Sequence, residues 1–433
     1  MKVTLNKDQV AASDFIIDRL VNKDEVGVTI IGEGGTGKTT SIMDAVSRLQ
    51  KAGLTTLMTA PTNKATNQLS FSADNFGVTT DCCTVAKSLG LALLPDQENK
   101  RAHKLGKGCI TEQMVVVVDE SSMLSSTALF DYLMPAIRSN GAKVIFMGDK
   151  FQLPPVKEFS SPALELFDYA ELTKVERQDG SSPILQLCKS LRESLSSGSN
   201  FSCLNPPVTT VKAALFTEEV INAFSTPEDC VGTRALAWTN TRVDDLTRYV
   251  RRRLFGRDAM PFVVGERVST GCPVMEGDLV VIPTDIEGVV KQVFDSNFEY
   301  STHGTKEYWR VLSVAIQPDG NYPFSIVNVI HPEEMPKYIE RLANLAKAAK
   351  AASGKQSFQL WKDYHHFKDS FQVLKHCYAM TVHRSQGSTY DKVLVDVADF
   401  QRCSHPRMRK QLAYVAFSRP RSELILNKVK FDL

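Results

Sequence analysis

The sequence predicts an α/β fold in more than one subdomain, and three observations support this prediction. The apolar run at residues 26–30 leads through a glycine-rich loop into residues 42–49, where apolar side chains recur at helical spacing. Four consecutive valines, 115–118, end in two acidic residues, as is typical of a buried parallel strand. At 433 residues, the chain is also longer than one ordinary core supports.

The glycine-rich loop follows the pattern G-x-x-x-x-G-K-T between a strand and a helix. Glycine lets backbone N–H groups approach anionic oxygens, and the helix that follows points its positive end at the same place. Lys38 can reach the β and γ phosphate oxygens, and the Thr39 hydroxyl can ligate Mg²⁺. We therefore expect a nucleoside triphosphate here, with a chance glycine-rich turn as the alternative. The predicted binding residues of the loop are Gly34, Gly35, Thr36, Gly37, Lys38, Thr39 and Thr40.

Composition places the chain among globular enzymes, with 43% hydrophobic and 23% charged residues. The formal net charge of +2 argues against a histone-like cover of positive charge, but it is compatible with a locally basic groove. No run approaches the ~18 apolar residues of a membrane span, and the N-terminus lacks the apolar region of a signal peptide. We expect no membrane contact and a cytoplasmic location.

The cysteines and histidines indicate no metal site. The nine cysteines are scattered without a C-x-x-C pair, which favours reduced thiols over zinc ligands or disulfides. His365 and His366 are expected to be a solvated pair on a polar segment.

Two segments near the glycine-rich loop carry polar side chains that could contact a nucleotide or a nucleic acid. Residues 5–20 predict a capped amphipathic helix. Within it, the Gln9 amide offers the donor and the acceptor that an adenine edge requires. A surface glutamine is the alternative. Residues 55–60 predict a second strand, followed by Pro61, Thr62 and Asn63 and then a helix. Because ligands collect at the carboxyl ends of parallel strands, these residues could hold a nucleic-acid backbone. Residues 79–86 repeat this pattern more weakly, and a plain capped helix is an equal alternative there.

The valine strand predicts catalytic chemistry at its end. Asp119 can hold hydrated Mg²⁺, and Glu120 can orient and deprotonate an attacking water. The alternative is that these two acidic residues only begin an ordinary polar loop after the strand. The polar residues 95–108, just before this strand, are expected to project as a small hairpin or insertion.

Further along the chain, uncharged and basic side chains extend the predicted site. Residues 143–148 form a third predicted strand, and Gln152 in the loop after it can sense a γ-phosphate. Arg177 matters only if it points at the nucleotide, where a guanidinium stabilises phosphoryl charge. Arg419, at a predicted helix end before a proline, is a second candidate for that role.

The remainder predicts a second α/β unit with an insertion. Serine, glycine and proline at 194–200 and 205–207 indicate a linker, after which the second unit starts at Arg234. A helix follows that carries five arginines, and charge of this kind is usually a solvated face. Short β-like runs at 262–332 are typical of a small β-barrel, and residues 335–371 are expected to be helical.

The ordered motifs resemble those of the superfamily 1 helicases over nearly the whole chain. They are the loop 32–39, residues 60–65, 117–123, 148–156, 381–387 and 414–421. The Gln-Leu-Pro-Pro-Val form at 152–156 resembles the 5′→3′ branch, of RecD/Dda-like type.

The resemblance implies two RecA-like P-loop domains, with a small pin-like insertion in the first and an SH3-like β-barrel insertion in the second. The implied divisions are domain 1A at 1–90 and 109–180, pin-like insertion 1B at 91–108, domain 2A at 181–260 and 372–433, and insertion 2B at 261–371.

The resemblance also implies roles for named residues, with ATP and Mg²⁺ bound between the two domains. Gln9, Gln386 and Gly387 would contact the nucleotide, Thr39 and Asp119 the metal. Lys38, Glu120, Gln152, Arg177 and Arg419 would be catalytic. The implied contacts to single-stranded nucleic acid are Pro61, Thr62, Asn63, Thr84, Asn240, His383 and Ser385.

The implied function is an ATP-dependent 5′→3′ DNA helicase, acting as a monomer on single-stranded and fork DNA. Single-stranded DNA-binding protein or replisome components are the implied protein partners, in phage DNA replication or recombination. The ATP motifs do not distinguish sugars, so an RNA-directed helicase and a nucleotide-gated DNA-binding module remain alternatives. In one respect the sequence departs from the family, because His103 is the only ring in the segment that would form the strand-separating pin.

Overall fold

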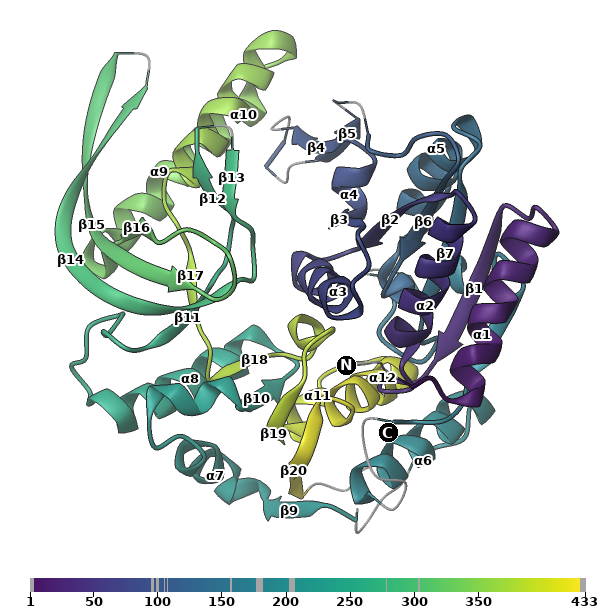
Figure 1. Ribbon diagram of the computed structural model, residues 1–433. Helices are drawn as coiled ribbons and strands as arrows, with labels where there is room; N and C mark the ends of the chain where they lie inside the picture. Colours follow the sequence, from purple (N-terminus) through teal and green to yellow (C-terminus); the bar gives the residue numbers. More distant parts are fainter. Residues whose placement is uncertain are drawn as a thin grey trace.

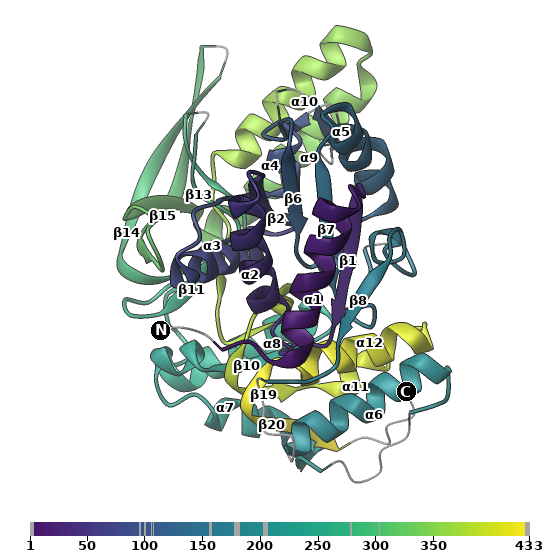
Figure 2. The ribbon, with the colours of Figure 1, turned by 45° about the vertical axis from the view of Figure 1, so that its right-hand side comes forward.

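The computed structural model describes residues 4–94, 97–98, 101–104, 106, 108–155, 158–176, 182–201, 207–277, 279–302 and 304–428. Two parallel β-sheets, each flanked by helices, form two units, and an antiparallel insertion rises beside the first unit (Figure 1). Turning the molecule shows the second unit lying beneath the first, with α6 and α12 below β1 and β8 (Figure 2).

The first unit is built on a six-stranded sheet in which every neighbouring pair of strands is parallel. The strand order is β3 (Asp81–Thr84), β2 (Thr55–Ala60), β6 (Met114–Val118), β7 (Lys143–Gly148), β1 (Gly27–Gly32) and β8 (Tyr169–Leu172). Its α-helices are α1 (Lys7–Ile17), α2 (Lys38–Lys51), α3 (Asn63–Phe76), α4 (Val85–Ser88) and α5 (Met134–Ser139).

The valines of β6 explain why this sheet lies in the middle of the unit. Val115 and Val117 pack into a core with α1, α2 and α3, while Val116 and Val118 pack into a second core with α4 and α5. Side chains alternate across a strand, so a continuous apolar run is buried only when helices cover both faces. The order of strands and helices then brings the carboxyl ends of β1, β2 and β6 to one edge.

The second unit has a five-stranded parallel sheet. The strand order is β18 (Ala379–Thr381), β10 (Thr233–Ala237), β19 (Tyr390–Val395), β20 (Pro420–Lys428) and β9 (Thr209–Lys212). One core contains side chains of α6 (Pro183–Ser197), α11 (Val397–Phe400) and α12 (Pro406–Phe417), and the other contains side chains of α7 (Phe216–Asn222) and α8 (Asn240–Phe255).

The insertion in the second unit combines an antiparallel sheet with two helices. The sheet order is β16 (Ser325–Ile330), β15 (Thr305–Pro318), β14 (Glu287–Thr302), β11 (Arg267–Thr270) and β17 (Leu374–His376), with β12 (Val274–Glu276) and β13 (Leu279–Ile282) as a separate pair. The helices α9 (Met335–Ala351) and α10 (Gly354–Asp369) agree with the helical prediction for 335–371. The strands β14 and β15 are far longer than the short runs predicted.

A hairpin also interrupts the first unit where a small projection was expected. The strands β4 (Leu91–Leu94) and β5 (Arg101–Lys104) pair antiparallel. Its tip meets the insertion, because Lys350 of α9 forms an ion pair with Glu98 at 2.6 Å and His365 Nε2 lies 2.6 Å from the Gln97 carbonyl oxygen.

Three sequence predictions need correction. Ser194–Ser197 are not linker, because α6 continues to Ser197 and buries Leu191 and Leu195 beneath α12. The second sheet begins before Arg234, with β9. Only one of the two histidines predicted to be solvated is so, since His365 is buried, whereas His366 is exposed and its Nδ1 lies 3.1 Å from the Tyr300 hydroxyl. Among the described helices, none is long and apolar enough to cross a bilayer.

Candidate active site

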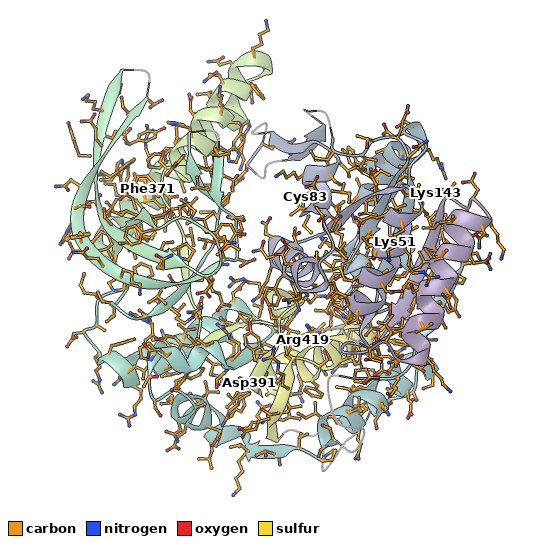
Figure 3. All side chains as sticks on the ribbon, in the orientation of Figure 1. Lys51, Cys83, Lys143, Phe371, Asp391 and Arg419 are labelled. Atoms are coloured by element: carbon orange, nitrogen blue, oxygen red, sulfur yellow. The ribbon has the colours of Figure 1, made fainter. Side chains whose placement is uncertain are left out.

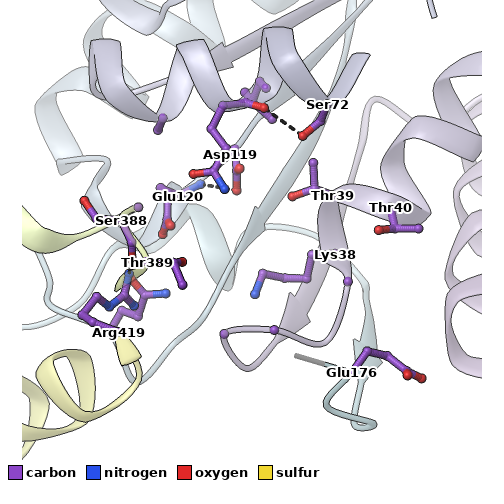
Figure 4. A pocket seen from close by; sticks show the side chains of 18 residues that line it. Lys38, Thr39, Thr40, Ser72, Asp119, Glu120, Glu176, Ser388, Thr389 and Arg419 are labelled. Atoms are coloured by element: carbon purple, nitrogen blue, oxygen red, sulfur yellow. Dashed lines mark hydrogen bonds between the residues drawn. The ribbon is translucent and has the colours of Figure 1, made fainter. Parts of the chain in front are cut away.

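A cavity of about 350 Å³ lies between the two units and is lined by residues of both. Figure 4 shows Lys38, Glu120 and Arg419 pointing toward one space from three directions. The cavity-lining residues are Gly34, Gly35, Gly37, Lys38, Thr39, Thr40, Ala65, Gln68, Leu69, Ser72, Asp119, Glu120, Gln152, Glu176, Gly387, Ser388, Thr389 and Arg419. Most of the predicted nucleotide-binding residues are therefore brought together.

The loop before α2 needs glycine for two separate reasons. Gly35 and Gly37 have positive φ angles of 89° and 78°, which L side chains rarely adopt. A Cβ on Gly37 would also collide with the Gln9 carboxamide. Thr36 is fully buried, and its hydroxyl donates to the Glu33 carbonyl at 3.0 Å, so it shapes the loop from behind the cavity wall.

The Lys38 ammonium lies at the mouth of this loop. It donates to the carbonyls of Gly32 at 2.8 Å and Glu33 at 2.9 Å. Lys38, Thr39 and Thr40 all belong to the first turn of α2, whose N-terminus faces the cavity. An ammonium, two hydroxyls and a helix N-terminus form a site for a polyanion with a bound cation.

Asp119 and Glu120 lie at the carboxyl end of β6. Burial first, and the adjacent Glu120 carboxylate second, raise the pKa of Asp119. The Glu120 N–H donates to Asp119 Oδ1 at 2.7 Å, and Glu120 itself has a left-handed backbone, φ 48° and ψ 39°. That conformation is costly for a residue with a Cβ and is typical of strained functional sites, and it turns consecutive carboxylates into one cavity.

Arg419 reaches the cavity from the second unit. It follows α12, and Figure 3 shows it at the junction of the two units. Only 4% of its surface is exposed, and burial lowers its pKa while the Glu120 charge opposes that shift. Its Nε donates to the Val415 carbonyl at 2.9 Å and its guanidinium nitrogens contact Ser388 and Ser418. These contacts fix the direction of the guanidinium.

Gln152 connects the cavity to the second unit. Its side chain is 5% exposed, and among the described residues its Oε1 has no hydrogen-bond partner. Its backbone carbonyl accepts from Gln411 Nε2 of α12 at 3.0 Å. The neighbouring Phe151 and Leu153 pack into the core of the second unit. In this loop, Gln152 therefore lines the cavity while its two neighbours pack against the opposite unit.

Two predicted nucleotide contacts lie beside the cavity rather than in its wall. Gln9 closes the capping box of α1 with Asn6 and donates to the Thr36 carbonyl at 3.2 Å. Each amide atom can still make one further hydrogen bond. Gln386 is 7% exposed and does not line the cavity, whereas Gly387 does. Arg177 lies outside the described residues, although the backbone of Glu176 next to it donates to the Gly35 carbonyl at 2.8 Å.

Several cavity residues were not predicted. Gln68 and Ser72 lie on α3, and Ser388 and Thr389 follow Gly387. Helical spacing of 68 and 72 could have placed two polar residues on one face, but nothing in the local sequence says what that face meets. Arg192 was also missed. From α6 its guanidinium reaches Glu33 at 3.4 Å and Asp149 at 3.8 Å.

The predicted nucleic-acid contacts of the first unit lie at helix N-termini. Thr62 caps α3 and accepts from the Ala65 N–H at 3.3 Å, with Pro61 before it and Asn63 as the first helical residue. Thr84 caps α4 in the same way and ends β3, so both the strand and the capped helix proposed for 79–86 are present. Backbone N–H groups at such positions can bind phosphates.

In the second unit, Asn240 begins α8 and is exposed. It lines a cavity of about 300 Å³ together with Lys375, Thr381 and Arg384. His383 is partly buried, and burial lowers its pKa, so it is a neutral hydrogen-bonding group at pH 7. Ser385 needs correction as a direct contact, because it is fully buried and its hydroxyl donates to the Val382 carbonyl at 2.7 Å.

Comparison with known proteins matches both halves of the chain. A family model described as "AAA domain" matches residues 4–200, and one described as "UvrD-like helicase C-terminal domain" matches residues 376–427. The two matches contain the first unit and the carboxyl part of the second.

Two relatives and one solved structure agree with these matches. The ATP-dependent DNA helicase dda of Enterobacteria phage T4 is 24% identical, over 94% of this chain and 96% of that protein. The ATP-dependent RecD2 DNA helicase of Deinococcus radiodurans is 32% identical over 38% of this chain and 21% of that protein. A Pif1 helicase structure described for DNA unwinding at forked duplexes has a TM-score of 0.54 and 18% identity, over 99% of this chain and 93% of that chain.

At this identity the Pif1 likeness concerns the fold, which fits a pair of RecA-like units. The likeness to dda covers nearly the entire sequence, and the motifs follow one order from the P-loop to Arg419. The chain is therefore similar to the superfamily 1 helicases of the 5′→3′, RecD/Dda-like branch, as its sequence predicted.

Proposed function

We propose that this protein is an ATP-dependent DNA helicase that moves 5′→3′ along single-stranded DNA and separates duplex strands. The observation that carries the proposal is the shared cavity, in which Lys38 and Glu120 of one unit face Arg419 of the other. A site completed by two units can couple hydrolysis to their relative movement.

The cavity residues fit ATP with Mg²⁺. The glycines of the loop and the N-terminus of α2 line the cavity, and Lys38 offers an ammonium. Among the described residues, Gln152 Oε1 has no hydrogen-bond partner and can accept a hydrogen bond. No described cluster of three or more His, Cys, Asp or Glu side chains could hold a metal alone. A divalent ion would therefore be held by Thr39, Asp119, phosphate oxygens and water, as Mg²⁺ usually is. It would neutralise charge on the phosphate oxygens.

The protein residues divide the work of hydrolysis. Lys38 binds the β and γ oxygens, and Glu120 accepts a proton from the attacking water. Arg419 stabilises charge that develops on the transferred phosphoryl group, which lies between the units. The burial of Arg419 strengthens this interaction because little water screens it. Arg177 would act from the first unit, and Gln9, Gln386 and Gly387 would contact the rest of the nucleotide.

The loop at 149–153 would carry the state of the nucleotide to the second unit. Asp149 is fully buried and accepts a hydrogen bond from the Tyr414 hydroxyl of α12 at 2.6 Å. Gln152 faces the γ-phosphate position and is tied to Gln411 on the same helix. When ATP binds and is hydrolysed, α12 and the loop would shift together and move one unit against the other.

Helix N-termini of both units would grip the strand. Thr62 and Asn63 at α3, Thr84 at α4 and Asn240 at α8 would contact backbone phosphates, with His383 nearby. Such grip is salt-sensitive. The DNA preference follows the relatives, which are DNA helicases by name, and makes the RNA-directed alternative the weaker one.

The proposed function also assigns a role to each domain and insertion. Domains 1A and 2A would be the two RecA-like domains, the hairpin β4–β5 the pin-like 1B, and the antiparallel sheet with α9 and α10 the SH3-like 2B. The resemblance supports a monomeric state, single-stranded DNA-binding protein or replisome components as partners, and a role in phage replication or recombination. The cytoplasmic location stays a prediction from the sequence.

ATP hydrolysis measured with single-stranded DNA, with RNA and with no polymer tests the proposal. We expect strong stimulation by DNA and weaker stimulation by RNA. Turnover that is independent of any polymer would reject the helicase function, and equal stimulation by RNA would favour the RNA-directed alternative.

A further inference from the structure

The arginine-rich helix α8 borders a second cavity that the proposed function does not use. This cavity of about 460 Å³ is lined by Asp244, Thr247, Arg248, Tyr249, Arg251, Arg252, Gly256, Arg257, Ala259 and His376. We call it the α8 groove. It shares Asp244, Thr247 and His376 with the cavity that contains Asn240. The two cavities therefore adjoin along α8.

Part of the positive charge in the α8 groove is already neutralised. Arg248 forms an ion pair with Asp245, and Arg251 contacts the buried Glu266 at 2.7 Å. Arg251 also donates to the Met260 carbonyl at 2.7 Å, which holds the loop after α8 against the helix. These arginines build the walls of the groove.

Two other arginines are left for a ligand. Arg252 and Arg257 are exposed, and among the described residues neither side chain has a hydrogen-bond or ion-pair partner. Lys375 adds a third exposed cation in the adjoining cavity. Asp244 is the only carboxylate among the described residues that line either cavity. The linings of the two adjoining cavities are thus rich in cations, although the chain as a whole is close to neutral.

An aromatic ring completes the groove. Tyr249 is 39% exposed, and the Arg248 guanidinium lies 5.7 Å from its ring centre. Arg252 and Arg257 line the same cavity as this exposed ring. Cations and an exposed ring in one groove can bind a single strand, because the cations bind phosphates while a base stacks on the ring.

We propose that the α8 groove is an outer binding site for single-stranded DNA, which extends the strand path beyond Asn240 by additional nucleotides. The site rests on the proposed function, since the strand must first occupy the cavity at Asn240. Arg252 and Arg257 bind backbone phosphates there, and Tyr249 stacks on a base. The helix is therefore more than a solvated charged face.

The chain offers a matched control for this site. Arg253 lies on the same helix, is exposed, and does not line the groove. R252Q and R253Q remove the same charge from adjacent positions, and R252Q/R257Q removes the two groove arginines that have no partner among the described residues. Binding is measured by fluorescence anisotropy with oligothymidylates lengthened one nucleotide at a time from the shortest that binds.

We expect the affinity of the wild type and of R253Q to keep rising with length after that of R252Q/R257Q has stopped rising. All should bind the shortest oligonucleotide equally. On long oligonucleotides, the slope of log affinity against log salt should be shallower by about 1.4 in the double variant, because each lost phosphate contact reduces the slope by about 0.7. A fourfold increase in salt would then weaken the wild type about sevenfold more than the variant. Y249A should lose affinity only on long oligonucleotides, and Y249F should keep it.

Three results would overturn the site. The first is that R252Q/R257Q and R253Q bind alike at every oligonucleotide length. The second is that the double variant loses as much affinity on the shortest oligonucleotide as on the long ones. Alternatively, a polyglutamate peptide would bind the wild type and not the double variant while DNA binding is unchanged, which would assign the groove to an acidic protein segment. DNA-stimulated ATP hydrolysis by the wild type, measured alongside, separates failure of this site from failure of the proposed function.

Discussion

Glu120 and Arg419 illustrate how a few residues could define the reaction. Glu120 has a left-handed backbone, and Arg419 is fixed by carbonyl and hydroxyl acceptors in a buried position. Both side chains therefore face one cavity in fixed directions before any nucleotide is considered. Such preorganised charges stabilise a transition state without further rearrangement.

Replacing Glu120 by Gln should abolish ATP hydrolysis and leave ATP binding intact, because the amide preserves shape but cannot accept the water proton. Lys38→Ala should abolish hydrolysis because it removes the cation that binds the phosphates. Turnover and equilibrium binding of a fluorescent ATP analogue check both. Wild-type turnover in Glu120→Gln would remove the base assignment.

Replacing Arg419 by Ala should lower the turnover number by roughly 10³-fold or more while nucleotide binding survives, as is usual for an arginine that stabilises the phosphoryl group. Arg419→Lys is the matched variant, since it keeps a charge but loses the planar fork. Thermal unfolding controls for the loss of buried hydrogen bonds. An unchanged rate in a folded Arg419→Ala protein would reject this role.

At the scale of elements, the loop at 149–153 and the helix α12 form one connection between the units. Asp149 accepts from the Phe151 N–H at 3.0 Å and from the Tyr414 hydroxyl, and Arg192 of α6 lies 3.8 Å away. Through Arg192, the network also reaches Glu33 in the P-loop. The buried Asp149 carboxylate can transmit movement between the units only while its hydrogen bonds to these donors are kept.

Tyr414→Phe should lower the free energy of unfolding by about 1–3 kcal/mol, because buried Asp149 loses a donor. It should also reduce the ratio of DNA-stimulated to basal ATP hydrolysis, which a purely structural role would not change. Chemical unfolding and ATPase assays measure the two effects. Tyr132→Phe, on a tyrosine away from this network, is the control, and equal ratios in the two variants would contradict the coupling role.

A second element-scale link is the ion pair between Arg234 on β10 and Glu287 on β14, at 3.0 Å. Burial alone would raise the pKa of Glu287, but the charges of Arg234 and Lys64 lower it to about 2. Its stabilising effect is therefore full above the ordinary pKa of 4.5 and is lost as pH falls toward about 2.

Glu287→Gln should destabilise the protein by about 3–5 kcal/mol near neutral pH, because buried Arg234 loses its counter-charge. The difference from wild type should shrink as pH falls from 4.5 toward 2. Unfolding free energies measured across this range check the prediction. A difference that grew on acidification would contradict it.

At the scale of the whole molecule, the sequence predicted what depends on local pattern. The glycine loop, the valine strand and the motif order indicated two α/β units and the residues Lys38, Thr39, Asp119, Glu120 and Arg419, which the structure brings to one cavity. What depends on packing between distant segments was missed. Arg192 of α6 lies close to Glu33 and Asp149, which are far from it along the chain, and no local pattern indicates this contact.

The same limit applies to the insertion and to α6. Serine residues at 194–197 are typical of a linker in isolation, but the buried leucines of α6 outweigh that preference once α12 covers them. The long strands β14 and β15 contain many polar residues, and their pairing with each other, not their local composition, sets their length.

The central claim is that ATP hydrolysis in the cavity between the units drives directed movement along single-stranded DNA. Unwinding of duplexes that carry a single-stranded tail at either the 5′ or the 3′ end tests it most directly, with Lys38→Ala as the control. We predict that the wild type opens the 5′-tailed duplex in the presence of ATP and Mg²⁺, that it leaves the 3′-tailed duplex closed, and that Lys38→Ala opens neither. Unwinding by Lys38→Ala, or opening of the 3′-tailed duplex alone, would contradict the account.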